Sequence, residues 1–164
     1  MKPELHRPLP VARIGADGLN RVVEASPTEC AALAARLGVP AVLGLTCRFD
    51  LKPGRDGVVA ARGRLNARVV QNCVVTLDDF ETTVAEDFTV RFLPEADQAE
   101  ELDLEADDEI PIRDGVIDLG EAAAEQLALA IDPYPRCPGA KLSQRELDVP
   151  EAPLARLGAL RARH

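Results

Sequence analysis

A period of two in the hydropathy pattern dominates the middle of the chain. Apolar side chains alternate with polar or small ones from Ala41 to Leu51, and the alternation resumes over residues 59–77 after a turn-forming stretch. Because successive side chains of a strand point to opposite faces, this predicts one half-buried strand followed by a long or bent one, broken only at Gln71. After Asp78-Asp79 the apolar residues change parity and continue to Phe92, which predicts a bulge or turn at the two aspartates.

Two helices are indicated by their start signals. Ser26-Pro27-Thr28-Glu29 has the pattern of a capping box with Pro at the first helical position, and opens an Ala/Leu helix that should stop at Gly38. Asp118 should cap a second helix over residues 118–131, which the Pro-rich run DPYPRCPG ends.

Shorter segments complete the expected fold. Residues 7–14 are predicted to form a first strand, and Asp114-Gly115 is a hairpin-like turn between two short apolar runs. The chain is therefore expected to be α+β, with a bent antiparallel sheet or a partly closed barrel and two main helices. The 164 residues suit a single domain over residues 1–142, followed by a tail, residues 143–164, that contains a short amphipathic helix.

Composition excludes several classes of protein. A formal net charge of −9 argues against binding phosphates over the whole surface, and four Phe, one Tyr and no Trp leave few platforms for base stacking. No apolar run approaches a membrane span, and the N-terminal residues lack the apolar stretch of a secretory signal. A cytoplasmic location is the expectation.

Neither a metal centre nor a catalytic centre is predicted. The four cysteines, Cys30, Cys47, Cys73 and Cys137, include no CxxC pair, so we expect reduced thiols packed mostly as small hydrophobes. The sequence also lacks a nucleophile elbow, a phosphate loop and any plausible Cys–His arrangement away from the termini. No cofactor is expected, and an enzyme is the weakest functional class.

Charge is unevenly distributed along the chain. Residues 41–72 contain six basic residues against two acidic ones, whereas residues 78–109 contain fourteen acidic residues against Arg91 alone. By parity, four arginines should project from the outer face of the sheet and could contact phosphates: Arg48, Arg62, Arg64 and Arg68. The acidic run 95–109 is expected to be a solvated loop, whose Glu100, Glu101, Asp103, Asp107 and Asp108 could bind a basic partner.

The order of several motifs resembles one bacterial family. Four segments in order resemble the YceD family of large-subunit ribosomal RNA accumulation proteins. They are VVQNCVVTLDDFETTVAEDFTVRFLP, an acidic stretch, the run from Ile112 to Glu121, and AAAEQLALAIDPYPRCPGA. The resemblance covers about residues 5–142. It implies a role in ribosome assembly and supplies no catalytic residues.

Two functions follow as hypotheses. The first is a non-enzymatic assembly factor that binds large-subunit ribosomal RNA through the arginines or a basic ribosomal protein through the acidic run. The second is a scaffolding adaptor that docks on a partner through the amphipathic C-terminal segment.

Overall fold

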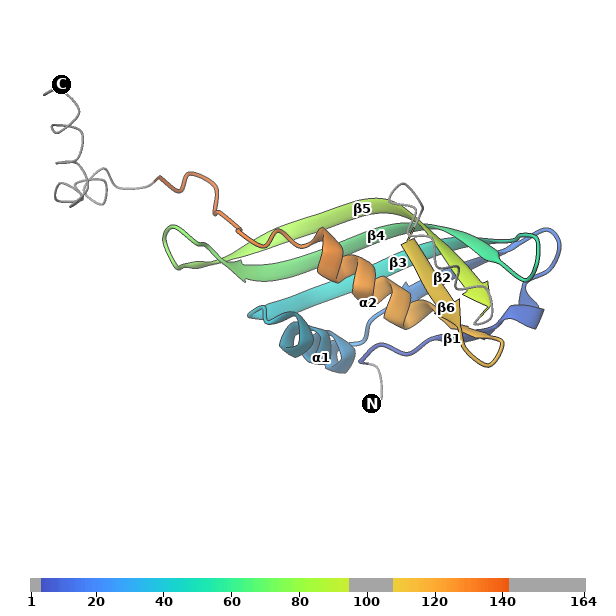
Figure 1. Ribbon diagram of the computed structural model, residues 1–164. Coiled ribbons are helices and arrows are strands. Elements are labelled where there is room, and N and C mark those ends of the chain that lie inside the picture. The colour runs from blue at the N-terminus through green and yellow to red at the C-terminus, as the bar shows by residue number, and fades with distance from the viewer. Residues whose placement is uncertain (1–3, 95–107, 142–164) are drawn as a thin grey trace, which may run out of the picture.

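The computed structural model describes residues 4–94 and 108–141, which form an open sheet with both helices on one of its faces (Figure 1). The main sheet has five strands in the order β2-β3-β4-β5-β6, and a second sheet pairs β1 with β7. The strands are β1 (Pro8–Pro10), β2 (Leu19–Glu24), β3 (Ala41–Pro53), β4 (Val59–Asn72), β5 (Asp79–Pro94), β6 (Asp108–Ile112) and β7 (Val116–Asp118). The helical elements are α1 (Pro27–Leu37), α2 (Leu119–Ala130) and a 3-10 turn, η1 (Val11–Arg13).

The three long central strands confirm the period-two pattern. Along β4, every second residue from Val59 to Gln71 is buried and the intervening ones are mostly exposed. Gln71, whose polarity interrupts the pattern, is nonetheless buried, because its side-chain nitrogen donates to the Asp132 carbonyl at 2.9 Å. The change of parity correctly predicted an interruption of the strand, but the turn lies at residues 74–76, before the two aspartates, and Asp79 already belongs to β5.

One position in β3 departs from the predicted alternation. Leu43 was assigned to the buried row, but its side chain is 46% exposed and Val42 is buried instead. The register between β3 and β4 shifts between Val42 and Gly44, which marks a bulge. The extra residue exchanges the two faces for the first residues of the strand.

The expectation of an antiparallel sheet is wrong at one edge. Strand β6 pairs with β5 in parallel, from Val90 opposite Asp108 to Pro94 opposite Ile112. A parallel pair cannot be joined by a tight hairpin turn, and β5 and β6 are accordingly well separated in the sequence. The five strands remain open, so the alternative of a partly closed barrel is not confirmed.

The N-terminal part also differs from the prediction. The strand expected over residues 7–14 is limited to Pro8–Pro10, because the chain winds into η1 directly afterwards. Strand β2, which the sequence did not indicate, lies at the edge of the sheet and leaves three of its central residues exposed. An edge strand with so little buried surface has no clear alternation to reveal it.

Both helices begin where the capping residues predicted. Ser26 and Glu29 form a reciprocal capping box, and Gly38 closes α1 in a left-handed conformation. Asp118 caps α2 by accepting from the Gly120 and Glu121 amides. The buried residues of both helices join the inner face of the main sheet in one hydrophobic core.

The turn at Asp114-Gly115 is confirmed, but it does not join a paired hairpin. Both residues have positive φ, and Arg113 and Val116 exchange backbone hydrogen bonds across the turn. The strands on either side diverge, since β6 pairs with β5 and β7 pairs with β1. The domain boundary at 142 and the amphipathic helix of the tail fall outside the described residues.

Candidate functional site

The face of the main sheet opposite the helices is exposed to solvent and carries the predicted arginines. Arg48 projects from β3, whereas Arg62, Arg64 and Arg68 project from β4, and all four side chains are exposed. They share a face because they occupy the parity opposite to the buried row of each strand. The structure therefore brings together the four residues proposed as phosphate contacts.

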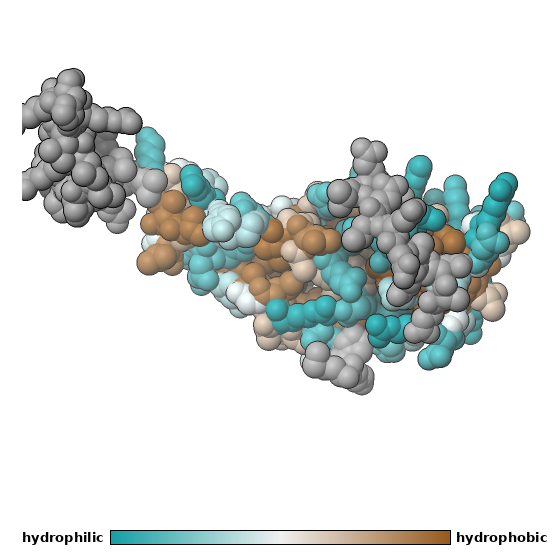
Figure 2. Space-filling view, viewed as in Figure 1, coloured by the Kyte–Doolittle hydropathy of each residue, from teal (hydrophilic) through white to brown (hydrophobic). Residues whose placement is uncertain are grey.

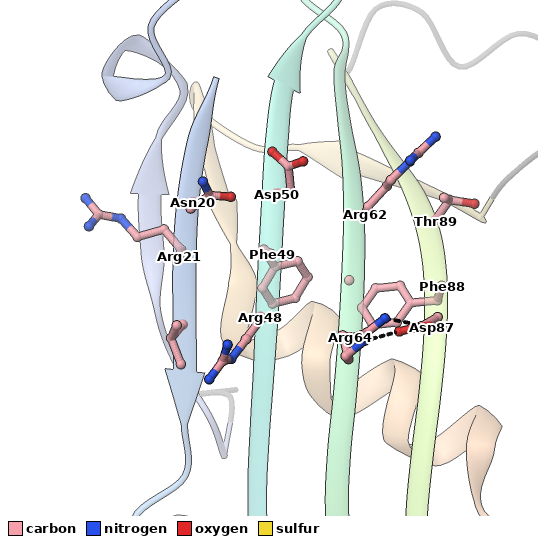
Figure 3. A pocket seen from close by; sticks show the side chains of 12 residues that line it. Asn20, Arg21, Arg48, Phe49, Asp50, Arg62, Arg64, Asp87, Phe88 and Thr89 are labelled. Carbon is pink, nitrogen blue, oxygen red and sulfur yellow. Dashed lines mark hydrogen bonds and ion pairs between the residues drawn. The ribbon is translucent and has the colours of Figure 1, made fainter. Parts of the chain in front are cut away.

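An open hollow of about 700 Å³ lies among three of these arginines (Figure 3). Its outer-face lining comes from four neighbouring strands, which explains why no single motif marks it. The residues that line it are Asn20, Arg21, Val22, Arg48, Phe49, Asp50, Arg62, Gly63, Arg64, Asp87, Phe88 and Thr89. Arg68 lies further along β4, outside the hollow.

Two of the arginines are engaged by carboxylates of β5. Arg64 donates two hydrogen bonds to the Asp87 carboxylate, from Nε at 2.6 Å and from Nη2 at 3.1 Å. Arg68 donates one to Glu81, from Nε at 2.7 Å. The hydrogen bonds that each arginine donates to its carboxylate raise the pKa of the arginine, and those from Arg64 lower the pKa of Asp87. These guanidinium groups would have to exchange a carboxylate for a phosphate in order to bind one.

The other two arginines have no ion pair with any residue in the described ranges. Arg48 lies opposite Arg64 on β3 and β4, and Arg62 lies opposite Asp50 two residues further along. Neither Arg48 nor Arg62 forms an ion pair within residues 4–94 or 108–141. Both line the hollow, and Figure 3 shows their guanidinium groups pointing away from each other. Of the four predicted arginines, these two remain available to a ligand, and Arg21, which also lines the hollow, likewise has no ion pair with the described residues.

The segregation of charge is less complete in three dimensions than along the sequence. Strand β5 brings Glu81 and Asp87 onto the same face as the arginines, so acidic and basic residues neighbour each other across β4 and β5. The uneven distribution of charge along the sequence therefore does not keep the two signs apart on this face. Sequence position cannot show this, because strand pairing decides which charges become neighbours.

Only one residue of the proposed acidic site falls within the described part of the chain. Asp108 begins β6 and accepts a hydrogen bond of 3.0 Å from the Gln126 side chain. The remaining four, Glu100, Glu101, Asp103 and Asp107, lie outside the described residues. Their role as a site for a basic partner stays a prediction.

Other residues of the hollow escaped the sequence analysis. Asn20 and Val22 come from β2, which was not predicted, and Val22 is 57% exposed. Behind the hollow, Phe88 packs over Gly63 and meets Phe49 edge-on, with ring centroids 5.8 Å apart. Gly63 and Phe88 both belong to the buried row of their strands, and the two residues lie opposite each other. This alternation is the sequence signal that could have indicated the packing.

A second cavity of about 600 Å³ lies between the N-terminal segment, β6 and α2. Arg36 lines this cavity and forms ion pairs with Glu4 at 3.0 Å and with Glu121 at 2.6 Å. Burial raises the pKa of Glu125, with a further contribution from Glu121. Its charged lining is thus largely engaged within the chain.

Two further properties concern the described residues alone. No group of three or more His, Cys, Asp or Glu residues in the described ranges could hold a metal ion. None of the helices in this part of the chain is long and apolar enough to cross a membrane.

The fold and the site define a two-layer α+β protein with a bare sheet face that carries both bound and free arginines. The family model "Large ribosomal RNA subunit accumulation protein YceD" matches residues 61–154, which is more than half of the chain. The chain belongs to the YceD family. Of the four arginines, Arg62, Arg64 and Arg68 lie within the matched segment and Arg48 precedes it. No curated protein matches the chain significantly, nor does any solved structure.

Proposed function

We propose that this protein supports the accumulation of large-subunit ribosomal RNA by binding RNA phosphates on the outer face of its sheet. The family description connects the chain with that RNA and names no catalysed reaction. The observation that carries the proposal is the position of Arg48 and Arg62 beside the hollow, where no carboxylate of the described residues engages them. A guanidinium binds phosphate through two parallel N–H groups, which makes an unpaired arginine a suitable contact.

The lining of the hollow favours contact with the RNA backbone. Its outer-face side chains are basic, amide, acidic, hydroxyl or small apolar groups, while the rings of Phe49 and Phe88 have the parity of the buried face. Base stacking on aromatic rings therefore has no platform among the residues that line this face. Phosphate contacts position RNA without reading its bases, so we expect weak sequence preference.

The net charge of −9 limits the footprint on RNA. Affinity that depends on two phosphate contacts should fall with salt along a shallow slope of roughly −1.4 to −1.8 in a plot of log K against log salt concentration. A steeper slope would mean that further cations beside Arg48 and Arg62, such as Arg21, also contact phosphates.

The test replaces Arg48 and Arg62 and compares this variant with one in which two other exposed arginines are replaced. The variant Arg48→Gln/Arg62→Gln and the control Arg13→Gln/Arg113→Gln lose the same charge, and Arg13 and Arg113 are exposed residues of η1 and the β6–β7 turn. Binding to fragments of large-subunit ribosomal RNA should weaken about tenfold or more in the first variant and little in the second. Equal affinities of the two variants would refute the proposal.

The same assay separates the other hypotheses. Capture of basic ribosomal proteins that survives RNase treatment, and that deletion of residues 96–108 abolishes, would favour the acidic run as the binding site. Loss of every partner after truncation following Lys141 would favour an adaptor that acts through its tail.

A further inference from the structure

Two cysteines that are far apart in the sequence meet at one end of the main sheet. Cys73 follows β4 at the turn into β5, and Cys137 follows α2. The segment after α2 runs along this turn (Figure 1), where the Val74 amide donates to the Pro135 carbonyl at 2.9 Å. The Cys137 amide donates to Cys73 Sγ at 3.3 Å, so the two residues are in direct contact.

Thr76 contacts both sulfur atoms. Its amide donates to Cys73 Sγ at 3.4 Å, and its hydroxyl lies 3.6 Å from Cys137 Sγ. A disulfide joins residues whose Cα atoms are roughly 4.4–6.8 Å apart. The backbone amide of Cys137 already contacts the sulfur of Cys73, which is compatible with that span.

The surroundings of Cys73 suit a thiolate. Burial of the sulfur opposes ionisation, but hydrogen bonds from Thr76 and from the amides of Cys137 and Val75 outweigh this and lower its pKa to about 6. The remaining cysteines are different: burial raises the pKa of Cys30, and it raises that of Cys47 to about 12. Thiolates are the reactive form of cysteine, which sets Cys73 apart from these two residues.

Exposure assigns different roles to the two sulfurs. Cys73 has no exposed surface, whereas Cys137 is partly exposed and is the one that an oxidant from solution can reach. We propose that Cys73 and Cys137 form an intramolecular disulfide when a hydroperoxide oxidises Cys137. This modification site is separate from the arginine hollow and does not depend on RNA binding.

The chemistry needs two steps. The sulfur of Cys137 loses its proton and attacks the peroxide, so that an S–O bond forms, the O–O bond breaks and the leaving oxygen takes a proton to become water or an alcohol. The Cys73 thiolate then attacks Cys137 Sγ, the S–S bond forms, the S–O bond breaks and hydroxide leaves to be protonated to water. Two thiols are oxidised and one peroxide is reduced.

The bond would connect the β4–β5 turn to the segment that follows α2. The two cysteines are 64 positions apart, since 137 − 73 = 64, so the disulfide would close a long loop. Closing a loop of this length restricts the unfolded chain and should stabilise the folded state. Oxidised protein should therefore unfold at a higher denaturant concentration than reduced protein.

The experiment treats the full, reduced chain with a small molar excess of hydrogen peroxide, blocks free thiols, and maps the peptides by mass spectrometry without reductant. We expect a Cys73–Cys137 linked peptide that dithiothreitol reverses, with Cys30 and Cys47 blocked as free thiols. The variant Cys137→Ser should lose both the link and the oxidation-dependent rise in denaturation midpoint. The control Cys47→Ser, which removes a buried thiol elsewhere, should keep the link.

Glutathione treated in a parallel tube shows that the peroxide is active. Three results would overturn the proposal. They are pairing of other cysteines, a disulfide between two chains, and overoxidation of Cys137 while Cys73 is still a free thiol that the blocking reagent modifies. Unchanged Cys73 and Cys137 under conditions that oxidise the glutathione would overturn it as well.

Discussion

Arg48 and Arg64 lie directly opposite each other on β3 and β4. Arg64 is bound to Asp87, whereas Arg48 has no ion pair with the described residues. Like charges at opposed positions of an antiparallel pair oppose folding, so Arg48 is a poor choice for stability alone. The proposed RNA contact would account for Arg48, which leads to the first prediction.

Replacing Arg48 with Thr should separate stability from binding. Threonine favours strands and removes the like charge beside Arg64, so the denaturation midpoint should rise slightly, most clearly at low salt. RNA binding should weaken in the same variant. Chemical denaturation and an RNA binding titration at matched salt measure the two effects, and a variant that loses stability and keeps its affinity would contradict the prediction.

Replacing Gly63 with Ala should destabilise the fold. A Cβ atom at this position would overlap the ring of Phe88, which also packs against Phe49. Overpacking of this kind costs about 1–3 kcal/mol in the free energy of unfolding. The second change Phe88→Leu should recover part of the loss, and a double-mutant cycle by urea denaturation measures the coupling. Additive effects would show that the two positions do not meet.

The ion pair between Glu29 and Arg7 should make stability depend on pH. The two side chains meet at 2.7 Å, and hydrogen bonds from Arg7 and then from the Ser26 amide lower the pKa of Glu29 from 4.5 to about 2. Because the pKa is lower in the folded protein, the stabilisation is complete above about pH 4.5 and is lost as the pH falls toward 2.

The variant Glu29→Gln isolates this effect, because glutamine can keep the reciprocal capping hydrogen bond of α1. We expect it to lower the free energy of unfolding by about 1 kcal/mol at pH 7 and to flatten the dependence between pH 4.5 and 2. Urea denaturation at several pH values provides the measurement. Parallel curves for the two proteins would exclude Glu29 as a source of the acid sensitivity.

Replacing Leu77 with Gly should stabilise the protein. Leu77 has a φ of 61° and is 79% exposed, so it combines a strained backbone with little buried surface. Figure 2 shows apolar side chains gathered around this turn between β4 and β5. Glycine adopts this conformation freely and should add about 1 kcal/mol to the free energy of unfolding.

Leu43→Gly is the matched control for that change. Leu43 is also exposed but belongs to β3, outside the positions with positive φ. Glycine in a strand interior weakens it, so the control should lose stability. Thermal or urea denaturation of both variants checks the opposite signs, and a loss of stability in both would show that backbone strain at Leu77 is not the dominant effect.

The sequence alone determined the local elements. The Ser26–Glu29 capping box, the Asp118 cap and the alternation along β4 were each confirmed, because short-range hydrogen bonding and side-chain periodicity are written in neighbouring residues. The order of its motifs also indicated the YceD family, which the family match shows.

The tertiary structure decided which of these elements are neighbours. The parallel pairing of β6, the edge strand β2 and the hollow depend on contacts between residues that are distant in the chain. Pairing of β4 with β5 also decided that Asp87 binds Arg64 while Arg48 stays unpaired among the described residues. Local periodicity gives the face on which a charge lies, but strand register decides which charge lies beside it, and that register is a property of the whole sheet.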